Sequence, residues 1–349
     1  MKKGRNLRSV NTDGGVNLQF KLLSAIGIII IVSGHCYHGG MELAYNWFPP
    51  YSYNLALFVF ISGYFYKTDY EENVGKYIWK RTKRLLIPAY LWNIFYGGMV
   101  AFLGLFGFTI GAKPDLYNLF VMPFVDGEAF QYNLGSWFVY PLFLVCIINV
   151  LFRKFLKLIH LDNEFIVLIV YLAIGMIGIN TALENPTAIN GIVKLLVRTM
   201  FFLPCYEFGR FYKAVLEKKD TLNNVAYFAI IFAVQLILLT FCKDLEYTPS
   251  SFTKFNNGFI IPYISSITAI AFWLRVSRLL VPAIGNSKLV RLIADNTYGI
   301  MVNQLVGFMC LKFVFYGLSR ITSGSLFGDF NVASFKSSIW YYYLPNGLQ

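Results

Sequence analysis

The sequence predicts an all-α protein that crosses a membrane many times. Hydrophobic residues make up 57% of the 349 residues and charged residues only 14%, whereas soluble domains carry about 25% charged residues. The mean hydropathy is +0.55. Several separate apolar stretches approach the ~20 residues that a helix needs to cross a bilayer, which excludes a single anchor on a soluble body. We therefore expect one domain over residues 1–349, a bundle of about nine to ten transmembrane helices.

Nine apolar stretches predict the spans. The basic residues 1–19 precede them and are expected to form a cytoplasmic N-terminal segment. The first stretch has no small-residue cleavage site, so we interpret it as a retained span and not as a signal peptide. The spans are expected at about 20–38, 51–66, 85–108, 135–152, 165–182, 191–209, 223–242, 258–275 and 297–317.

Positive charge alternates between the two sides of the predicted bundle. The connection at 67–84, on the side of the N-terminus, holds six Lys or Arg residues, whereas the connections at 39–50 and 183–190 hold none. This alternation follows the positive-inside rule with a cytoplasmic N-terminus. The net charge of +12 is therefore attributed to topology and lipid headgroups, and nucleic-acid binding is not expected.

Metal and disulfide chemistry have no signature in this sequence. There is no HExxH, GxSxG or Walker motif and no acidic cluster of metal-ligand spacing, so no metal is expected. The five cysteines form no CxxC pair and read as small buried hydrophobic residues. They are Cys36, Cys146, Cys205, Cys242 and Cys310.

His35 is the residue that most strongly indicates chemistry. It lies within the first apolar stretch, and no side chain between Lys21 and His35 titrates. At ~1.5 Å per residue the imidazole lies roughly 20 Å along a helix from the lysine, inside the bilayer. An ionisable side chain at that depth is costly and marks a functional site, and histidine accepts a proton near neutral pH. Glu42 and Glu128 are the candidate carboxylates that would orient the ring.

Arg81 and Arg84 form a second candidate site, directly before the third apolar stretch. Three residues apart, they would share one face of an α-helix at the cytoplasmic surface. Two guanidinium groups in that position suit a phosphate-rich ligand. The alternative is ordinary snorkelling of basic residues to the membrane surface.

Other polar residues inside apolar stretches could contact a substrate. Ser62, beside Gly63, could mark a close approach to a ligand, or only small-residue helix packing. Trp137 could stack on a sugar ring, or only lie at the membrane interface. The adjacent amides of Asn303 and Gln304 could line the cavity around His35 or join helices. Arg198, with Lys194 four residues earlier, could contact an anionic glycan or snorkel.

An ordered series of motifs resembles the acyltransferase-3 family of integral membrane O-acyltransferases, which modify bacterial surface glycans. The resemblance depends on VSGH at 32–35, FVFISGYFYK at 58–67, WKRTKRLLIPAYLWN at 79–93, GSWFVYPLF at 135–143 and NTYGIMVNQ at 296–304. It implies that His35 is the catalytic base and that Arg81 and Arg84 contact an acyl-CoA donor. It also implies a bacterial plasma membrane location and ten spans, so that a final span would follow residue 349.

Two positions depart from the family pattern. Many members carry a basic residue eleven positions before the histidine, and this chain has Ser24 there. Either Lys21, one turn earlier, replaces it at the donor site, or this chain lacks the role. The histidine common in the late motif is Asn303, which leaves His35 as the expected base.

Together these features predict an enzyme that moves an acetyl group from cytoplasmic acetyl-CoA to a hydroxyl of a surface polysaccharide or its lipid-linked precursor. The expected partners are the lipid bilayer, the acyl-CoA and the glycan, and a homodimer is left open. A polar passage should link His35 to the paired arginines. The rival hypothesis is a transporter or flippase for a lipid-linked or anionic glycan, with His35 as a proton relay.

Overall fold

Helices form almost all of the described chain. The structure is a computed structural model, and it describes residues 12–13, 16–36, 46–106, 112–127, 130–242, 244–247 and 255–321. Two short strands, β1 (Thr12–Asp13) and β2 (Val16–Asn17), pair antiparallel before the first helix. The α-helices are α1 (Leu18–Cys36), α3 (Asn54–Tyr64), α4 (Val74–Arg81), α5 (Ile87–Gly104), α6 (Met122–Val125), α7 (Val139–Leu158), α8 (Glu164–Glu184), α9 (Gly191–Phe211), α10 (Asn224–Phe241), α11 (Ile261–Ile284), α12 (Lys288–Asp295) and α13 (Thr297–Ile321).

Short 3-10 and π-helical turns join or extend these helices. They are η1 (Pro50–Ser52), η2 (Thr68–Tyr70), η3 (Thr82–Leu86), η4 (Tyr117–Val121), η5 (Gln131–Phe138), η6 (Pro186–Ala188) and η7 (Tyr212–Leu216).

Asparagine side chains bond to backbone N–H groups at the starts of three helices. Asn17 accepts a hydrogen bond from the backbone of Phe20, Asn163 from Phe165 and Asn223 from Ala226, over 3.1, 2.8 and 2.8 Å. Each bond satisfies one of the N–H groups that a helix leaves unpaired at its start. All three asparagines lie at helix ends that the charge pattern assigns to the cytoplasmic side.

Six helical stretches among the described residues are long and apolar enough to cross a membrane, so the chain is a multi-pass membrane protein. They are Leu18–His35, Val74–Gly104, Tyr132–Leu158, Glu164–Glu184, Asn224–Phe241 and Ile261–Ile284. Two further apolar helices, Asn54–Tyr64 and Thr297–Leu311, are shorter. The helix α9 is as long as the others but carries four charged residues, Lys194, Arg198, Glu207 and Arg210. The six spans confirm the predicted fold class, and the total of nine to ten stays a prediction.

The third predicted span differs most from the structure. The sequence indicates a start near residue 85, whereas one helical stretch runs from Val74 to Gly104 through α4, η3 and α5. Pro88 lacks the N–H that an α-helix needs, and the chain passes this point through the π-helical turn η3. The residues of α4, before the proline, are amphipathic, and they extend the helix beyond the apolar stretch that predicts the third span.

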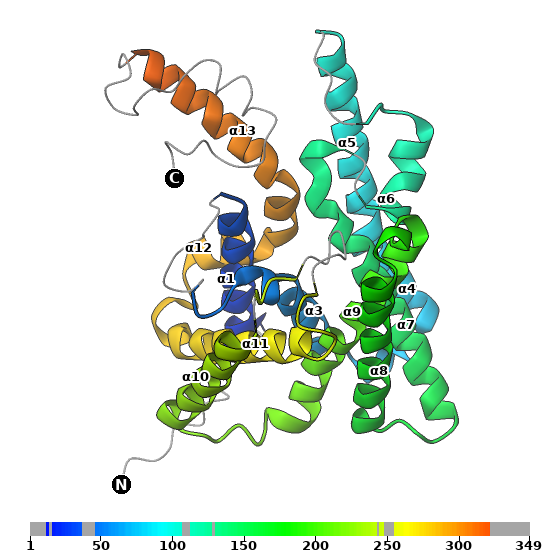
Figure 1. The fold of residues 1–349 in the computed structure, drawn as a ribbon, viewed down its shortest axis with the longest axis vertical. Helices are drawn as coiled ribbons and strands as arrows, with labels where there is room; N and C mark the ends of the chain where they lie inside the picture. Colours follow the sequence, from blue (N-terminus) through cyan, green and yellow to red (C-terminus); the bar gives the residue numbers. More distant parts are fainter. Residues whose placement is uncertain are drawn as a thin grey trace.

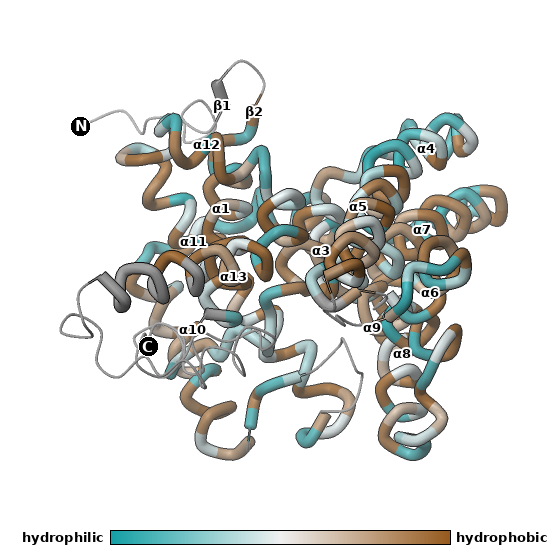
Figure 2. Tube along the Cα trace, turned by 90° about the horizontal axis from the view of Figure 1, so that it is seen from above, coloured by the Kyte–Doolittle hydropathy of each residue, from teal (hydrophilic) through white to brown (hydrophobic). Residues whose placement is uncertain are grey.

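The helices form two groups joined by α3. In Figure 1 the helices α1, α10, α11, α12 and α13 lie on one side, and α4 to α9 lie on the other. Figure 2 shows hydrophobic residues along most of the length of α1, α3, α7 and α11, whereas α4 is largely hydrophilic. Because α3 packs against both α1 and α9, it places the first helix beside the second group.

Two glycines allow α3 and α9 to cross at backbone contact. A Cβ atom built on Gly63 would lie 1.8 Å from the carbonyl oxygen of Tyr206, and one on Gly209 would lie 1.9 Å from that of Phe60. Neither position therefore accepts a side chain without separating the helices. This contact explains the SGY motif at 62–64 as helix packing.

A buried ion-pair cluster joins α7, α8 and α9. Arg153 donates to Glu207 over 2.6 Å and to Glu164 over 2.7 Å, and Arg210 donates to Glu164 over 2.8 Å. Glu207 is fully buried, with an exposed fraction of 0%. Charges at this depth are stable only when paired, so the cluster fixes the relative positions of the three helices.

Candidate active site

A cavity of about 90 Å³ lies where the two helix groups meet, and His35 lines it. Its walls come from α1, η1, α3, η5, α13 and the segment 244–247. It is large enough to hold several water molecules. The lining residues are Ile31, His35, Tyr51, Asn54, Leu55, Gly135, Trp137, Phe138, Tyr247, Met301 and Gln304.

The helix α1 delivers His35 to this cavity. Its inner residues are apolar and pack in the core, so the imidazole is the ionisable group that the helix brings to the junction. Tyr51 donates a hydrogen bond to the carbonyl oxygen of Gly34 over 3.0 Å, and its ring meets the imidazole edge-on at a centroid distance of 6.3 Å. The turn before α3 thus fixes the end of α1 beside the cavity.

The turn η5 brings α13 against the opposite wall. A Cβ atom on Gly135 would lie 2.8 Å from the carbonyl oxygen of Met301, so only glycine permits this approach. Gln304 follows one turn later on α13 and is 7% exposed. Its Oε1 atom has no hydrogen-bond partner in the described part of the chain. A buried amide of this kind is suited to a ligand or water in the cavity.

Trp137 and Arg198 form one unit. The guanidinium of Arg198 lies 4.5 Å from the centroid of the indole ring and donates to the backbone oxygen of Asp126 over 2.7 Å. The Asp126 carboxylate pairs with Lys194 at 2.5 Å. Trp137 lines the cavity, whereas Arg198 lies behind it and is 1% exposed. The structure therefore places Arg198 as a support of the indole and not on the cavity wall.

Two other predicted contact residues point elsewhere. Asn303 accepts a hydrogen bond from the hydroxyl of Tyr96 over 3.0 Å and donates to Gly299 over 2.8 Å, so it joins α13 to α5. Ser62 donates to the carbonyl oxygen of Phe58 over 3.0 Å, inside its own helix. Neither residue lines the cavity of His35.

The two arginines of the predicted donor site have different surroundings. Arg81 is half-buried, with its guanidinium 5.0 Å from the ring centroid of Tyr77, whereas Arg84 is exposed. The sequence prediction that they share a face assumes α-helical geometry. Arg84 lies in the π-helical turn η3, which has more residues per turn and moves the second arginine outward.

Neither arginine lines the cavity of His35, so within the described residues one continuous cavity does not link the two sites. Lys21 lies near the other end of α1 and pairs with Asp295 of α12. Glu42 and Glu128, the candidate partners of the imidazole, lie outside the described residues.

Sequence reasoning missed three polar lining residues. Tyr51, Asn54 and Tyr247 all face the cavity. Asn54 offered a weak signal, since it is an amide at the start of an apolar stretch. Tyr51 and Tyr247 offered none, because 24 tyrosines are spread along the chain.

This arrangement defines a class of protein, a multi-pass helical membrane protein with a histidine inside its bundle. A family model for an acyltransferase domain, that of the acyltransferase-3 family, matches residues 17–342. The chain belongs to this family, which confirms the resemblance of its motifs, and it is a membrane acyltransferase. No curated protein and no solved structure matches the chain.

Proposed function

We propose that the chain transfers an acetyl group from cytoplasmic acetyl-CoA to a hydroxyl of a surface polysaccharide or its lipid-linked precursor, with His35 as the general base. One observation carries the proposal. One cavity is lined by His35, Trp137 and Gln304, which lie far apart in the sequence. Each of the three was predicted as a candidate from a different motif. A base can activate a sugar hydroxyl, an amide can stabilise the oxyanion, and an aromatic side chain can contact the sugar ring.

The chemistry follows from these three groups. The neutral imidazole of His35 removes the proton of the sugar hydroxyl as its oxygen attacks the thioester carbonyl. The side-chain amide of Gln304 can donate a hydrogen bond to the oxyanion that forms. When the tetrahedral intermediate collapses, the carbon–sulfur bond breaks and the imidazolium returns its proton to the departing thiolate. The indole of Trp137, held by Arg198, supplies an apolar part of the cavity wall that a sugar ring can contact.

Arg81 supports the assignment of the donor site. In the described part of the chain its guanidinium makes no ion pair with a carboxylate, and its buried Nε atom has no hydrogen-bond partner. A half-buried cation without a carboxylate is suited to a ligand phosphate. Arg84, exposed one turn later, can reach the same nucleotide from the aqueous side.

Buried tyrosine hydroxyls support a route between the two sites. Tyr77 and Tyr206 lie beside Arg81, and Tyr140 lies near Tyr298 on α13, about one turn before Met301 of the cavity wall. All four hydroxyl groups are buried without a hydrogen-bond partner in the described part of the chain. Unsatisfied polar groups of this number suit water or the polar arm of a bound donor.

The decisive experiment is mass spectrometry of the surface polysaccharide from cells that carry the wild-type or a variant chain. His35→Asn should remove acetylation, because loss of a general base costs about 10²- to 10⁴-fold in rate. His160→Asn is the matched control, since His160 is exposed at a helix end with φ of 57°, which asparagine adopts readily. Normal acetylation in a folded, membrane-inserted His35→Asn variant would contradict the proposal.

A further inference from the structure

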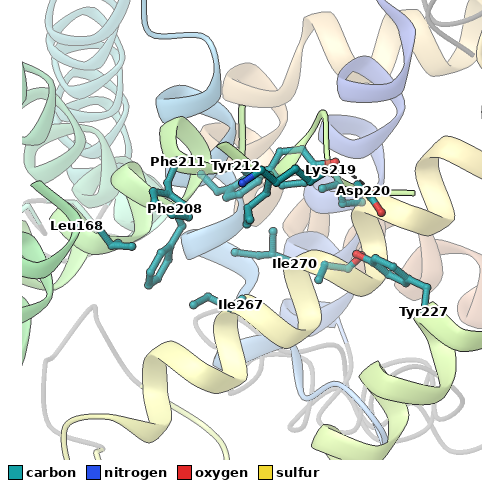
Figure 3. Close-up of a pocket in the computed structure, with 13 residues that line it drawn as sticks. Leu168, Phe208, Phe211, Tyr212, Lys219, Asp220, Tyr227, Ile267 and Ile270 are labelled. Atoms are coloured by element: carbon teal, nitrogen blue, oxygen red, sulfur yellow. Dashed lines mark hydrogen bonds between the residues drawn. The ribbon is translucent and has the colours of Figure 1, made fainter. Parts of the chain in front are cut away.

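A second cavity in the described part of the chain lies away from His35. It has a volume of about 400 Å³, within the range of ligand pockets, and shares no lining residue with the cavity of His35. Figure 3 shows its walls, which come from α3, α8, α9, η7, α10 and α11. Most of its lining residues are apolar, among them Phe208, Leu216, Ile267 and Ala271.

One edge of this cavity is polar. Lys219 and Asp220 lie together there, away from Phe208 and Ile267, in Figure 3. Lys219 is exposed and Asp220 is half-buried. The edge belongs to the connection between α9 and α10, which the charge pattern assigns to the cytoplasmic side. The cavity therefore joins an apolar interior to a charged end at one surface of the membrane.

The charged end has an excess of cations. Asp220 is shared by two guanidinium groups, that of Arg275 and, at 2.8 Å, that of Arg278. Lys219 adds a third positive charge. Arg278 also donates to the hydroxyl of Tyr212 over 2.8 Å, and the five N–H donors of a guanidinium leave others for a ligand. Glu217, which accepts a hydrogen bond from Tyr64 and lies near Tyr212, is a second carboxylate at this end. Three cations against two carboxylates leave one positive charge, which favours an anionic group at this edge.

We propose that this cavity binds the hydrocarbon chain of an anionic membrane lipid whose phosphate group contacts Lys219 and Arg278. The chain spans a bilayer, and two apolar lining residues, Leu216 and Ile267, are exposed, so the cavity is open to lipid. The cytoplasmic leaflet has a negative surface potential. The apolar walls match a lipid chain and the cationic edge matches a phosphate diester. This site is separate from the proposed acetyl transfer, and neither proposal depends on the other.

Two variants and their matched controls test the two halves of the site. Ala271→Phe places a ring inside the cavity, whereas Ala229→Phe adds the same ring at an exposed position of α10 that does not line it. Lys219→Gln removes the exposed charge at the edge, and Lys218→Gln removes that of its exposed neighbour, which is not part of the lining. Neither set alters residues that line the cavity of His35.

The measurement is native mass spectrometry and thermal unfolding of the purified chain in detergent, with three probes. These are dioleoyl phosphatidylglycerol, dioleoyl phosphatidylcholine and glycerol 3-phosphate. Wild-type protein should retain one phosphatidylglycerol and unfold at a higher temperature with it than with phosphatidylcholine. Ala271→Phe should weaken retention at least tenfold and Lys219→Gln severalfold, while both controls and His35→Asn behave as wild type.

Three results would overturn this inference. Equal retention of the two lipids would remove the role of the cationic edge. An equal stabilisation by glycerol 3-phosphate would indicate a free-anion site that needs no lipid chain. Unchanged phosphatidylglycerol retention in Ala271→Phe would place the lipid elsewhere. Because no acetyl donor or glycan is present, these outcomes are independent of the activity of the enzyme.

Discussion

Two arginines inside the bundle have opposite environments. Arg153 has a side chain only 4% exposed, and it contacts the carboxylates of Glu164 and Glu207 and, over 3.2 Å, the amide oxygen of Asn149. Arg81 is half-buried against Tyr77, and no carboxylate pairs with it among the described residues. In the first arrangement the charge of Arg153 is neutralised by carboxylates without a ligand, whereas the second leaves a cation that a ligand can neutralise.

This difference separates structural charges from candidate binding charges. Removing one partner of a buried pair leaves the other uncompensated, so a closed cluster such as that of Arg153 stabilises one packing of helices. An unpaired cation in the membrane destabilises the fold, so its presence indicates a functional role such as binding. Sequence position alone does not distinguish them, since both arginines lie at the cytoplasmic end of a predicted span.

The largest stability change should come from breaking the closed cluster. Arg153→Leu leaves Glu207 buried with no cation at bonding distance, which should cost about 3–5 kcal/mol of folding free energy. Thermal unfolding of the purified protein in detergent measures this loss. Arg81→Leu is the comparison variant, and it should unfold at or above the wild-type temperature. Equal losses in the two variants would end the distinction between the two regions.

For the binding of acetyl-CoA, in contrast to stability, Arg81 should matter more than Arg153. Arg81→Ala removes a charge-assisted contact worth about 1.5–3 kcal/mol, so the dissociation constant measured by calorimetry should rise about tenfold or more. The exposed Lys76 on the same helix provides the control, and Lys76→Ala should bind as wild type. A transporter would bind coenzyme A and its acetyl ester no better than other anions. Unchanged affinity in Arg81→Ala would remove the donor site from this position.

Arg84→Ala sharpens the same comparison with a smaller expected effect. Arg84 is exposed, and solvent and salt weaken its contact with a phosphate. Its loss should raise the dissociation constant only about two- to fivefold, and the effect should fade at high ionic strength. A larger effect than that of Arg81→Ala would mean that the exposed arginine is the main phosphate contact.

Arg198→Gln tests positioning inside the site. Arg198 contacts the indole and not the cavity, so its loss should raise the KM for the glycan severalfold while leaving acetyl-CoA affinity unchanged. Kinetics of acetyl transfer with purified protein separate the two parameters. A loss of kcat alone, with KM unchanged, would mean that Arg198 affects the chemical step and not the tryptophan.

Hydrophobic runs predicted the helices closely, because a long apolar stretch in a bilayer has no alternative to a helix. The expected span at 297–317 and the helix α13 begin at the same residue, Thr297. The helix α12 was not predicted, because eight residues with alternating charge and apolar character resemble a loop. The sequence did not predict that the third span extends back to Val74, because this extension contains many polar residues.

The residue types of the candidate site could be predicted from the sequence, but the directions in which their side chains point could not. Asn303 and Gln304 are adjacent, and the sequence gives no reason to prefer one. On a helix they point about 100° apart, and only Gln304 faces the cavity, because Gly135 draws that side of α13 against η5. The separation of Arg81 from Arg84 depends on a π-helical turn that no spacing rule indicates.

The most direct test of the account is an experimental structure of the chain with a non-hydrolysable thioether analogue of acetyl-CoA. The account predicts nucleotide phosphates against Arg81 and the acetyl end beside His35, with the connecting arm past the buried tyrosine hydroxyls. An analogue bound with its acetyl end outside the cavity that His35 and Gln304 line would contradict the assignment of this cavity as the place of acyl transfer.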